Sequence, residues 1–431
     1  MFRILKISDI SILNKETYKK SELPSYLNYL DTGSLTRNKV ESFQLLELNE
    51  DKIPSRAQRK AKIDTILYST VRPNQEHFGF VDNLVDNLIV STGFTTIDVI
   101  DEDIYPKYLY YKLTQNYITD YLHTIGMSSV SAYPSISPND LGALKFKFPI
   151  YKTQKQIAKV LSDLDSKIEL NNKINTELET ASKLLYNYWF VQFDFPNENG
   201  KPYKSSGGKM VYNEALKRDI PERWESGVIK DWIGNDKSGD WGKESEQGNY
   251  VQRVSCVRGA DINGLNGKGE VKSPTRYILE KNSHKILEIG DLIVEISGGS
   301  PTQSTGRLAF IIDKTLERFN DPLICSNFCK AVTLKEEKAL YNFVYLWNRL
   351  YDAGVLFGWE GKTSGIKNLL FDSFVSNYKV VLPDSKLMEV FYEKIHPIHS
   401  QIQKNLEQNH KLAELRDWLL PMLMNGQVRV N

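Results

Sequence analysis

Two stretches of this chain decide its fold: residues 157–171 (IAKVLSDLDSKIELN) and residues 391–405 (FYEKIHPIHSQIQKN). In both, apolar residues recur at alternating steps of four and three. Each position of the second series lies 234 residues after its counterpart, because 391 − 157 equals 423 − 189. The chain is therefore predicted to be two copies of one unit, a globular block followed by a long helix. The series are Ile157, Leu161, Leu164, Ile168, Asn171, Asn175, Leu178, Ser182, Leu185 and Trp189, and Phe391, Ile395, Ile398, Ile402, Asn405, Asn409, Leu412, Arg416, Leu419 and Leu423.

This spacing predicts that the two helices take part in a coiled coil. The first series spans 32 residue steps, or about 48 Å of α-helix. Both series carry two asparagines at their centre, which we interpret as the residues that fix the register: Asn171 and Asn175, and Asn405 and Asn409. An amide at such a seam costs stability unless it meets another polar group, so we expect the helices to pair with each other. The alternative is that each helix packs only on its own block.

The orientation of the pair follows from the same positions. In a parallel pair Asn171 faces Asn405. In an antiparallel pair, positions that sum to 580 meet, so that Asn171 faces Asn409 and Asn175 faces Asn405. Both arrangements pair the amides. The chain order of block, helix, block and helix favours the antiparallel pair, because each helix then spaces the two blocks apart.

The two blocks are predicted to share one mixed fold. Strand-like runs at 66–68 and 88–90 correspond to runs at 291–294 and 323–326 in the second block. The predicted class is α+β, with two similar mixed α/β domains joined by two long helices in an antiparallel coiled coil, and an internal pseudo-two-fold repeat. The predicted segments are a first domain (1–150), a helix (151–193), a linker (194–219), a second domain (220–383) and a C-terminal helix (384–431).

Composition excludes several classes of protein. Hydrophobic residues make up 41% and charged residues 25% of the chain, which is ordinary for globular protein, and no apolar run is long enough to span a membrane. Three cysteines (Cys256, Cys325 and Cys329) are too few for a disulfide framework, so we expect a reducing, cytoplasmic compartment and no metal site. The net charge is +1, so any binding to nucleic acid has to rest on local basic clusters or on partners.

Four segments carry a resemblance to a known family. Residues 156–171, 189–197 and 200–210 resemble the central conserved region of the specificity (S) subunits of Type I restriction-modification systems. Residues 415–428 are similar to the C-terminal conserved region of that family. The blocks resemble the family only weakly, and the first block lacks the segment Ile220-Pro-Glu-Arg-Trp224 that opens the second.

The resemblance implies a DNA sequence-recognition subunit that performs no catalysis. It implies two target recognition domains that each read half of a split site in double-stranded DNA, and a helix pair that fixes the unread spacer. It also implies partners, namely two modification (methyltransferase) subunits and, for cleavage, restriction (endonuclease and translocase) subunits. S-adenosylmethionine, ATP and Mg²⁺ are expected on those partners, with no cofactor in this chain.

Two other functions are open from the sequence. One is a DNA methyltransferase or nuclease with an unrecognised site, although the chain has neither an N/D-P-P-aromatic tetrapeptide nor a GxxxxGK[ST] phosphate loop. The other is a coiled-coil adaptor that binds only proteins. We predict no catalytic residues.

Polar and basic loops are the predicted DNA contacts, because Arg reads guanine, Asn or Gln reads adenine, and other polar groups hold phosphates. The loops around 72–77 and 126–133 have counterparts at 300–307 and 361–367, which favours them over isolated clusters. The alternative for each is a solvated face or an ordinary turn. The predicted DNA-binding residues are Arg56, Arg59, Lys60, Arg72, Asn74, Gln75, His77, Ser128, Ser129, Tyr133, Arg258, Ser300, Thr302, Gln303, Arg307, Lys362, Thr363, Ser364 and Lys367.

The helix length also predicts the spacer. Two readers held apart by helices of about 48 Å face the DNA about one turn apart, since DNA turns once in about 34–36 Å or about 10 bp. If each reader covers about 3–5 bp, about 5–8 bp stay unread.

Overall fold

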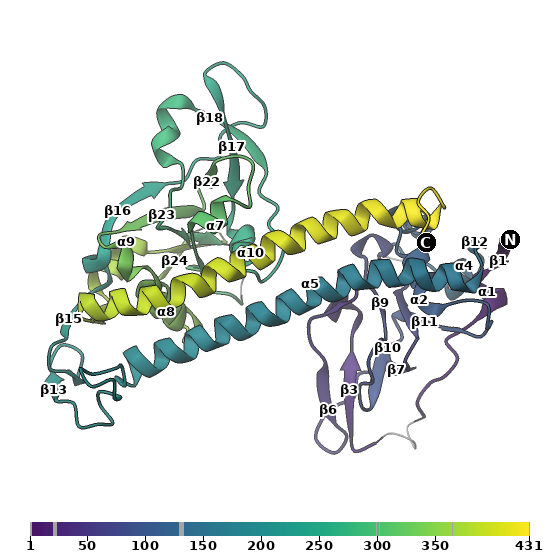
Figure 1. Ribbon diagram of the computed structural model, residues 1–431, viewed down its shortest axis with the longest axis horizontal. Coiled ribbons are helices and arrows are strands. Elements are labelled where there is room, and N and C mark those ends of the chain that lie inside the picture. The colour runs from purple at the N-terminus through teal and green to yellow at the C-terminus, as the bar shows by residue number, and fades with distance from the viewer. Residues whose placement is uncertain are drawn as a thin grey trace. The chain divides into compact units, whose positions relative to one another are not determined.

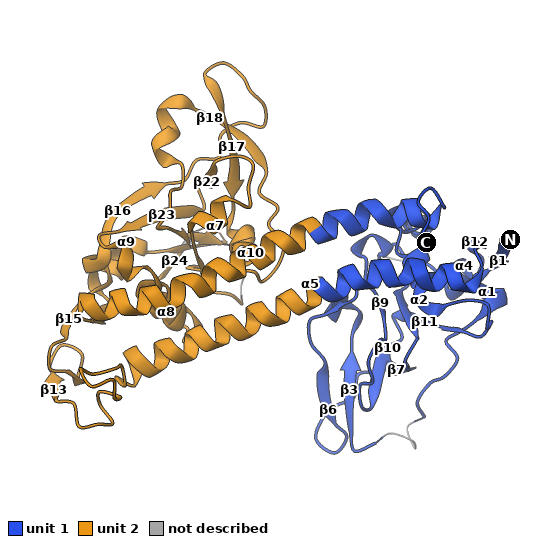
Figure 2. Cartoon of the chain, in the orientation of Figure 1, with its two compact units in different colours: residues 1–167, 412–431 blue, residues 168–411 orange. Residues whose placement is uncertain are grey.

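The computed structural model describes residues 2–19, 24–128, 133–298, 300, 302–363 and 365–430, leaving out the side chains of residues 362 and 363. The chain divides into two compact units, residues 1–167 with 412–431 and residues 168–411 (Figure 2). Both long helices contribute to both units, since α5 spans Tyr151–Tyr186 and α10 spans Ser385–Met424. A π-helical turn, Asn187–Val191, follows α5.

The first unit contains two four-stranded sheets of short strands (Figure 1). The elements are β1 (Arg3–Lys6), α1 (Ile7–Ile10), β2 (Ser11–Leu13), β3 (Tyr26–Leu30), β4 (Leu35–Thr36), β5 (Lys39–Val40), β6 (Gln44–Glu47), β7 (Ala57–Lys60), β8 (Ile66–Ser69), β9 (Phe78–Phe80), β10 (Leu88–Ser91), β11 (Phe94–Val99), α2 (Pro106–Leu113), α3 (Asn116–Met127), α4 (Pro138–Gly142) and β12 (Lys145–Phe148). One sheet has the antiparallel order β2-β11-β8-β9. In the other, β6-β3-β10-β7, strand β3 is antiparallel to β6 and parallel to β10.

The second unit follows the same plan and adds a hairpin and a small sheet. Its elements are β13 (Met210–Asn213), β14 (Arg218–Pro221), β15 (Glu225–Val228), β16 (Ile233–Ser238), β17 (Tyr250–Val257), α6 (Ile262–Leu265), β18 (Thr275–Leu279), β19 (Asp291–Glu295), β20 (Ser297–Gly298), β21 (Leu308–Phe310), α7 (Asp313–Leu316), β22 (Leu323–Cys325), β23 (Cys329–Leu334), α8 (Leu340–Asp352), β24 (Glu360–Thr363), β25 (Ile366–Leu369), α9 (Phe371–Asn377) and β26 (Lys379–Leu382). The order β16-β23-β19-β21 is again antiparallel. Strand β17 is again antiparallel to β18 and parallel to β22. The additions are the hairpin β13–β14 and the sheet β20-β25-β24.

This shared strand order confirms the predicted internal repeat. Strands β8 and β19, which contain the predicted runs at 66–68 and 291–294, hold the same place in the antiparallel sheets. The pairing of β1 with β12 is matched by that of β15 with β26. In β12 the alternation Lys-Phe-Lys-Phe leaves the lysines exposed and buries the phenylalanines, as a half-buried strand requires.

One buried hydrogen bond recurs in both units with its donor and acceptor exchanged. In the first unit, Thr65 Oγ1 donates to Asp98 Oδ1 at 2.7 Å, from the segment before β8 to strand β11. In the second unit, Thr333 Oγ1 on β23 donates to Asp291 Oδ1 on β19 at 2.5 Å. The residue three positions before Thr65 or Asp291 donates its backbone N–H to that side chain in each case. The fold therefore preserves the bond at this position, whichever strand supplies the acid.

The long helices are bound to the units through their apolar seams. In the first unit Ile157 and Leu161 of α5 are at most 4% exposed and belong to the core cluster of α2, α3 and β12. In the second unit Trp189, Phe391 and Ile395 are buried in the cluster that also contains α8. Each block is therefore packed on a helix segment and not merely tethered to it.

The helices run antiparallel, which confirms the predicted orientation. In the second unit Asn171 Nδ2 donates to Asn409 Oδ1 at 2.9 Å, and Asn405 Nδ2 donates to Asn175 Oδ1 at 2.7 Å. The two residue numbers of each pair sum to 580, as an antiparallel arrangement requires. In the first unit Arg416 Nη1 donates to Asp165 Oδ1 at 2.9 Å, again across an antiparallel pair.

The exchanged hydrogen bond predicts a mutational cycle in the first unit. Thr65→Val leaves the Asp98 carboxylate, which is 8% exposed, without its hydroxyl donor, so we expect a loss of about 1–3 kcal/mol in the free energy of unfolding. Thr65→Val with Asp98→Leu removes both partners and should recover most of that loss. Denaturant unfolding measures both, with Thr124→Val on the exposed face of α3 as the control. A double variant no more stable than the single one would contradict this account.

Candidate nucleic-acid interface

A strained turn projects between β8 and β9 in the first unit. The 3-10 turn Pro73–Gln75 is flanked by Arg72, with φ 47°, and Glu76, with φ 55°. Both lie in the left-handed region, which costs a residue with a Cβ about 1–2 kcal/mol, and such strain collects at functional sites. The turn leaves Asn74 and Gln75 exposed. It therefore presents two side-chain amides on a backbone of fixed shape.

The second predicted loop of this unit packs against the turn. Arg72 donates its backbone N–H to Pro134 O at 2.8 Å, and its guanidinium lies 4.4 Å from the centre of the Tyr133 ring. A β-bridge joins Val71 to Ser135. The structure thus brings together two loops that the sequence predicted separately.

The end of α3 leads into this second loop. Ser128 is exposed, and its hydroxyl donates to Ile125 O at 2.9 Å. Ser129, also predicted as a contact, lies outside the described residues.

A third loop at this place was missed by the sequence analysis. The tight turn Arg37–Asn38 joins β4 to β5, and both residues have positive φ. Arg37 donates its backbone N–H to Glu76 O at 3.0 Å, and its Nε lies 2.6 Å from Glu76 Oε2. The signal was available, because Asn between two short β-prone runs favours the left-handed conformation of such hairpin turns.

Two of the other predicted cations of the first unit, Arg59 and Lys60, make contacts within the unit. Arg59 on β7 is partly buried, its Nη2 donates to Thr92 O at 3.4 Å, and burial lowers its pKa. The Lys60 ammonium lies 4.7 Å from the Tyr18 ring centre. Arg56, just before β7, is exposed.

His77 is also held by its own unit. Its Nδ1 lies 2.7 Å from Leu35 O and 3.1 Å from Thr36 Oγ1. The imidazole therefore ties the end of the strained turn to β4, the strand that leads into the Arg37–Asn38 turn.

Equivalent loops meet in the second unit. The segment between β19 and β21 pairs with β25, with Ser297 opposite Asn368 and Gly298 opposite Lys367. Lys367 Nζ also donates to Gln303 O at 3.2 Å. The side chains of Lys362 and Thr363 and the whole of Ser364, all predicted contacts, lie outside the described residues.

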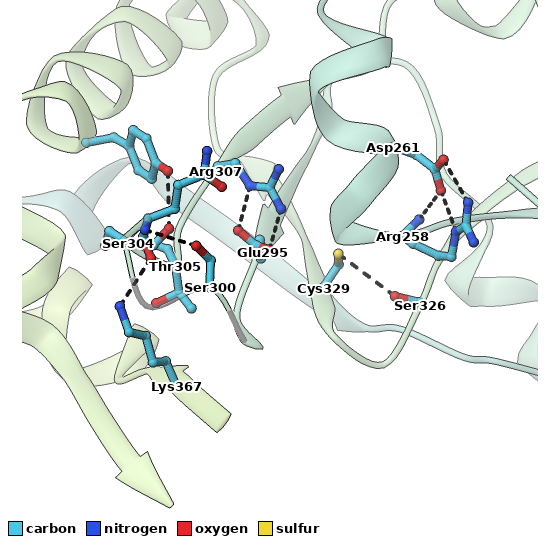
Figure 3. A network of polar contacts seen from close by, with 12 residues as sticks. Arg258, Asp261, Glu295, Ser300, Ser304, Thr305, Arg307, Ser326, Cys329 and Lys367 are labelled. Carbon is cyan, nitrogen blue, oxygen red and sulfur yellow. Dashed lines mark hydrogen bonds and ion pairs between the residues drawn. The ribbon is translucent and has the colours of Figure 1, made fainter. Parts of the chain in front are cut away.

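Three predicted cations of the second unit are neutralised by carboxylates of the same unit. Figure 3 shows the pair of Arg307 with Glu295 and the pair of Arg258 with Asp261. Arg307 forms a bidentate pair with Glu295, at 2.9 Å from Nε and 2.6 Å from Nη2. Arg258 forms a similar pair with Asp261, at 2.9 and 3.2 Å. In both pairs the carboxylate raises the pKa of the guanidinium. Lys367 Nζ lies 3.3 Å from Glu360 Oε2.

In the second unit, the loop between β19 and β21 exposes uncharged polar side chains. Thr302 and Gln303 are exposed, and Ser300 is half-buried with its Oγ 3.4 Å from Thr302 Oγ1 and 3.2 Å from Gln303 N. The turn of the first unit exposes Asn74 and Gln75 in the same topological place. Amides and hydroxyls at the tips of two anchored loops suit hydrogen bonds to base edges, whereas phosphate binding calls for unpaired cations.

The described ranges also bear on other kinds of site. No group of three or more His, Cys, Asp or Glu side chains there is placed to hold a metal ion. The three cysteines are buried and unpaired, and burial raises the pKa of Cys256 and Cys325 to about 12. None of the helices in the described ranges has the length and apolarity that crossing a membrane requires.

Comparison with known proteins points to one family. Residues 2–180 match the family model described as the Type I restriction modification DNA specificity domain. The chain is 25% identical to the Type I restriction enzyme HindI specificity subunit of Haemophilus influenzae, over 96% of this chain and 98% of the relative. It is also 25% identical to the MjaIX specificity subunit of Methanocaldococcus jannaschii, over 85% of this chain and 78% of the relative.

A solved structure shares the fold. The S subunit of a Type I restriction-modification system from M. genitalium aligns with a TM-score of 0.57 and 15% identity, covering 98% of this chain and 96% of that one. The similarity therefore extends over both copies of the repeat and both long helices.

The pairing of Arg307 predicts a structural role that can be separated from DNA contact. Arg307→Met leaves the Glu295 carboxylate, which is 5% exposed, uncompensated, so we expect a loss of about 3 kcal/mol or more in the free energy of unfolding. Arg253→Met is the control, because Arg253 pairs with Asp321 at 3.1 Å on an exposed face and should cost about 0–1 kcal/mol. Denaturant unfolding of both variants measures the difference. Equal stabilities would mean that Arg307 does not hold the loop.

Proposed function

We propose how this chain, which belongs to the Type I restriction-modification specificity subunits, divides the recognition of DNA between its two copies. The chain is the DNA sequence-recognition subunit and is not itself an enzyme. Each copy reads one half of a bipartite site in double-stranded DNA through its paired loops. The helices α5 and α10 set the length of the unread spacer between the halves.

The recurrence of the loop pair is the observation that carries this proposal. In both copies the loop after β8 or β19 is joined to a second loop far away in the chain. A chance cluster of polar residues would not recur at the same topological place twice. The exposed predicted residues are the proposed contacts, namely Arg56, Asn74, Gln75, Ser128, Tyr133, Thr302 and Gln303.

The boundaries of the functional parts follow the strand and helix ends. We propose target recognition domains at 1–150 and 220–383, because two residues separate β12 from α5, and two residues separate β26 from α10. The segments at 151–193 and 384–431 form the helix pair. The linker at 194–219 contains β13 and the start of β14, whose hairpin supports a role as a folded connector.

Exposed apolar residues on the helices support a pair of partner subunits. Leu184 on α5 is 63% exposed and Trp418 on α10 is 56% exposed, and 418 − 184 equals the repeat interval of 234. Tyr188, in the π-helical turn after α5, and Leu415 on α10 extend the two patches on the same flank of each helix. We propose that each patch docks one modification subunit. Restriction subunits join for cleavage, and S-adenosylmethionine, ATP and Mg²⁺ are bound by those partners.

Methylome sequencing tests the function. Cells that express this chain with its modification subunits should methylate one bipartite motif, and deletion of the chain should abolish that motif while the modification subunits are still present. If deletion of the chain removes no methylated motif, the proposal is wrong. Methylation by the purified chain alone would favour the enzyme alternative.

A matched shortening of both helices adds a geometric test. Residues 166–172 and 408–414 face each other in the antiparallel pair and are mostly exposed, so their joint deletion removes one heptad from each helix with little loss of domain packing. We expect a spacer shorter by about 3 bp, because seven residues span about 10 Å of helix and DNA rises about 3.4 Å per base pair. Deletion of 166–172 alone is the control that breaks the register. A joint deletion that still modifies the original motif would refute the role of the helices.

Docking through the two patches predicts stepwise loss of partners. Leu184→Glu and Trp418→Glu should each remove one modification subunit, and the double variant should remove both, because a charge at the centre of an apolar contact is left desolvated. Native mass spectrometry of the assembled complex counts the subunits. Thr176→Glu, on the other flank of α5, is the control. Full assembly of the double variant would show that partners bind elsewhere.

A further inference from the structure

One buried carboxylate lies beneath the reading loop of the second unit. The Glu360 side chain, at the start of β24, is 6% exposed. It accepts a hydrogen bond from Thr305 N at 2.7 Å and from Thr305 Oγ1 at 3.1 Å. Thr305 lies at the end of the loop that exposes Thr302 and Gln303. The carboxylate therefore fixes the loop backbone two residues after its exposed tip.

The same carboxylate forms an ion pair with a lysine. Lys367 on β25 lies 3.3 Å from Glu360 Oε2, and its ammonium also donates to Gln303 O at 3.2 Å. Its side chain is 16% exposed and packs 5.0 Å from the ring centre of Phe357. Although burial acts to raise the pKa of Glu360, hydrogen bonds from Thr305 and Lys367 outweigh it and lower that pKa. Glu360 is therefore charged at neutral pH and neutralises Lys367.

Two side chains of α8 also anchor the loop near this point. Trp347 Nε1 donates to Gly306 O at 2.7 Å, and the Tyr351 hydroxyl donates to Ser304 O at 3.2 Å. Both contacts hold backbone carbonyls from the side of α8. The contacts of Glu360 and Lys367 hold the loop from the side of the β24–β25 hairpin, so the two sets of anchors act from different elements.

We propose that Glu360 is a positioning residue for DNA reading by the second unit, which fixes the loop at Thr305 and withholds the Lys367 ammonium from DNA phosphates. This inference rests on the proposed function. A phosphate contact strengthens binding to every sequence alike, whereas amide and hydroxyl contacts at base edges discriminate. By neutralising Lys367, Glu360 keeps the uncharged tip as the main contact of this loop.

The test uses Glu360→Gln in the full chain assembled with its modification subunits. Glutamine keeps the size and one acceptor for Thr305 but releases Lys367. We expect tighter binding to non-specific duplex DNA, with a slope of log K against log salt that is steeper by about 0.9, the value for one added phosphate contact. We also expect about tenfold weaker discrimination in the half-site of the second unit, a change within the range for one base contact. Discrimination in the other half-site should not change.

Two further variants separate the roles of the carboxylate. Glu360→Gln with Lys367→Gln removes the released charge, so its salt slope should return to that of the wild type. Thr305→Ala loses the hydroxyl contact but keeps the ion pair, so it should weaken discrimination without changing the salt slope. Glu222→Gln, in an exposed ion pair with Lys209, is the matched control and should alter neither quantity. Thermal melting of each variant reports its folding.

The outcomes distinguish this inference from the proposed function. If the wild-type complex prefers a bipartite site but Glu360→Gln changes neither the salt slope nor the discrimination, the inference is wrong. Weaker binding to specific and non-specific DNA alike, with a lower melting temperature, would also overturn it in favour of a purely structural role. If the wild-type complex shows no sequence preference, the proposed function fails and the inference fails with it.

Discussion

Polar contacts between α5 and α10 are the constraint on which the rest of the structure depends. The asparagine layers require amides to meet, but parallel and antiparallel pairs both satisfy that requirement. Arg416 makes the choice, because it occupies the seam position whose counterpart in the first copy is Ser182. A parallel pair would set this guanidinium against one hydroxyl, whereas the antiparallel pair gives it the Asp165 carboxylate at 2.9 Å. Tyr111 of the first unit donates to the same carboxylate at 2.6 Å, so the contact that orients the helices also attaches a domain to them.

The parts of the structure predictable from sequence were those encoded by spacing. The interval of 234 residues gave the repeat, and the alternation in Lys145-Phe-Lys-Phe148 gave strand β12. Both signals are regular spacings of residues, and they are set directly by which side chains the fold buries. The recurring loops were also located correctly, because their place between two strands is a property of the repeat and does not depend on their own residues.

Pairing of charges was the part that sequence could not supply. Arg307 and Arg258 look like DNA contacts in the sequence, where a guanidinium in a polar loop carries no sign of its partner. Glu295 reaches Arg307 only because β19 and β21 are adjacent strands, and Asp261 reaches Arg258 because a short 3-10 turn brings it back. The Arg37–Asn38 turn carried a sequence signal of its own in Asn38, but only the folded hairpin places it beside Glu76.

The near-neutral charge of the chain has a physical meaning once these pairs are known. Of the cations near the loop between β19 and β21, Arg307 pairs with Glu295 and Lys367 pairs with Glu360. Such a loop adds little to the sequence-independent attraction between a protein and DNA phosphates. Specificity is the difference between binding to the right site and binding to all others, so a recognition subunit gains by contributing to the first and not to the second. Under the proposed function, the attraction that holds the complex on DNA would come from partner subunits, and this chain would decide where the complex stays.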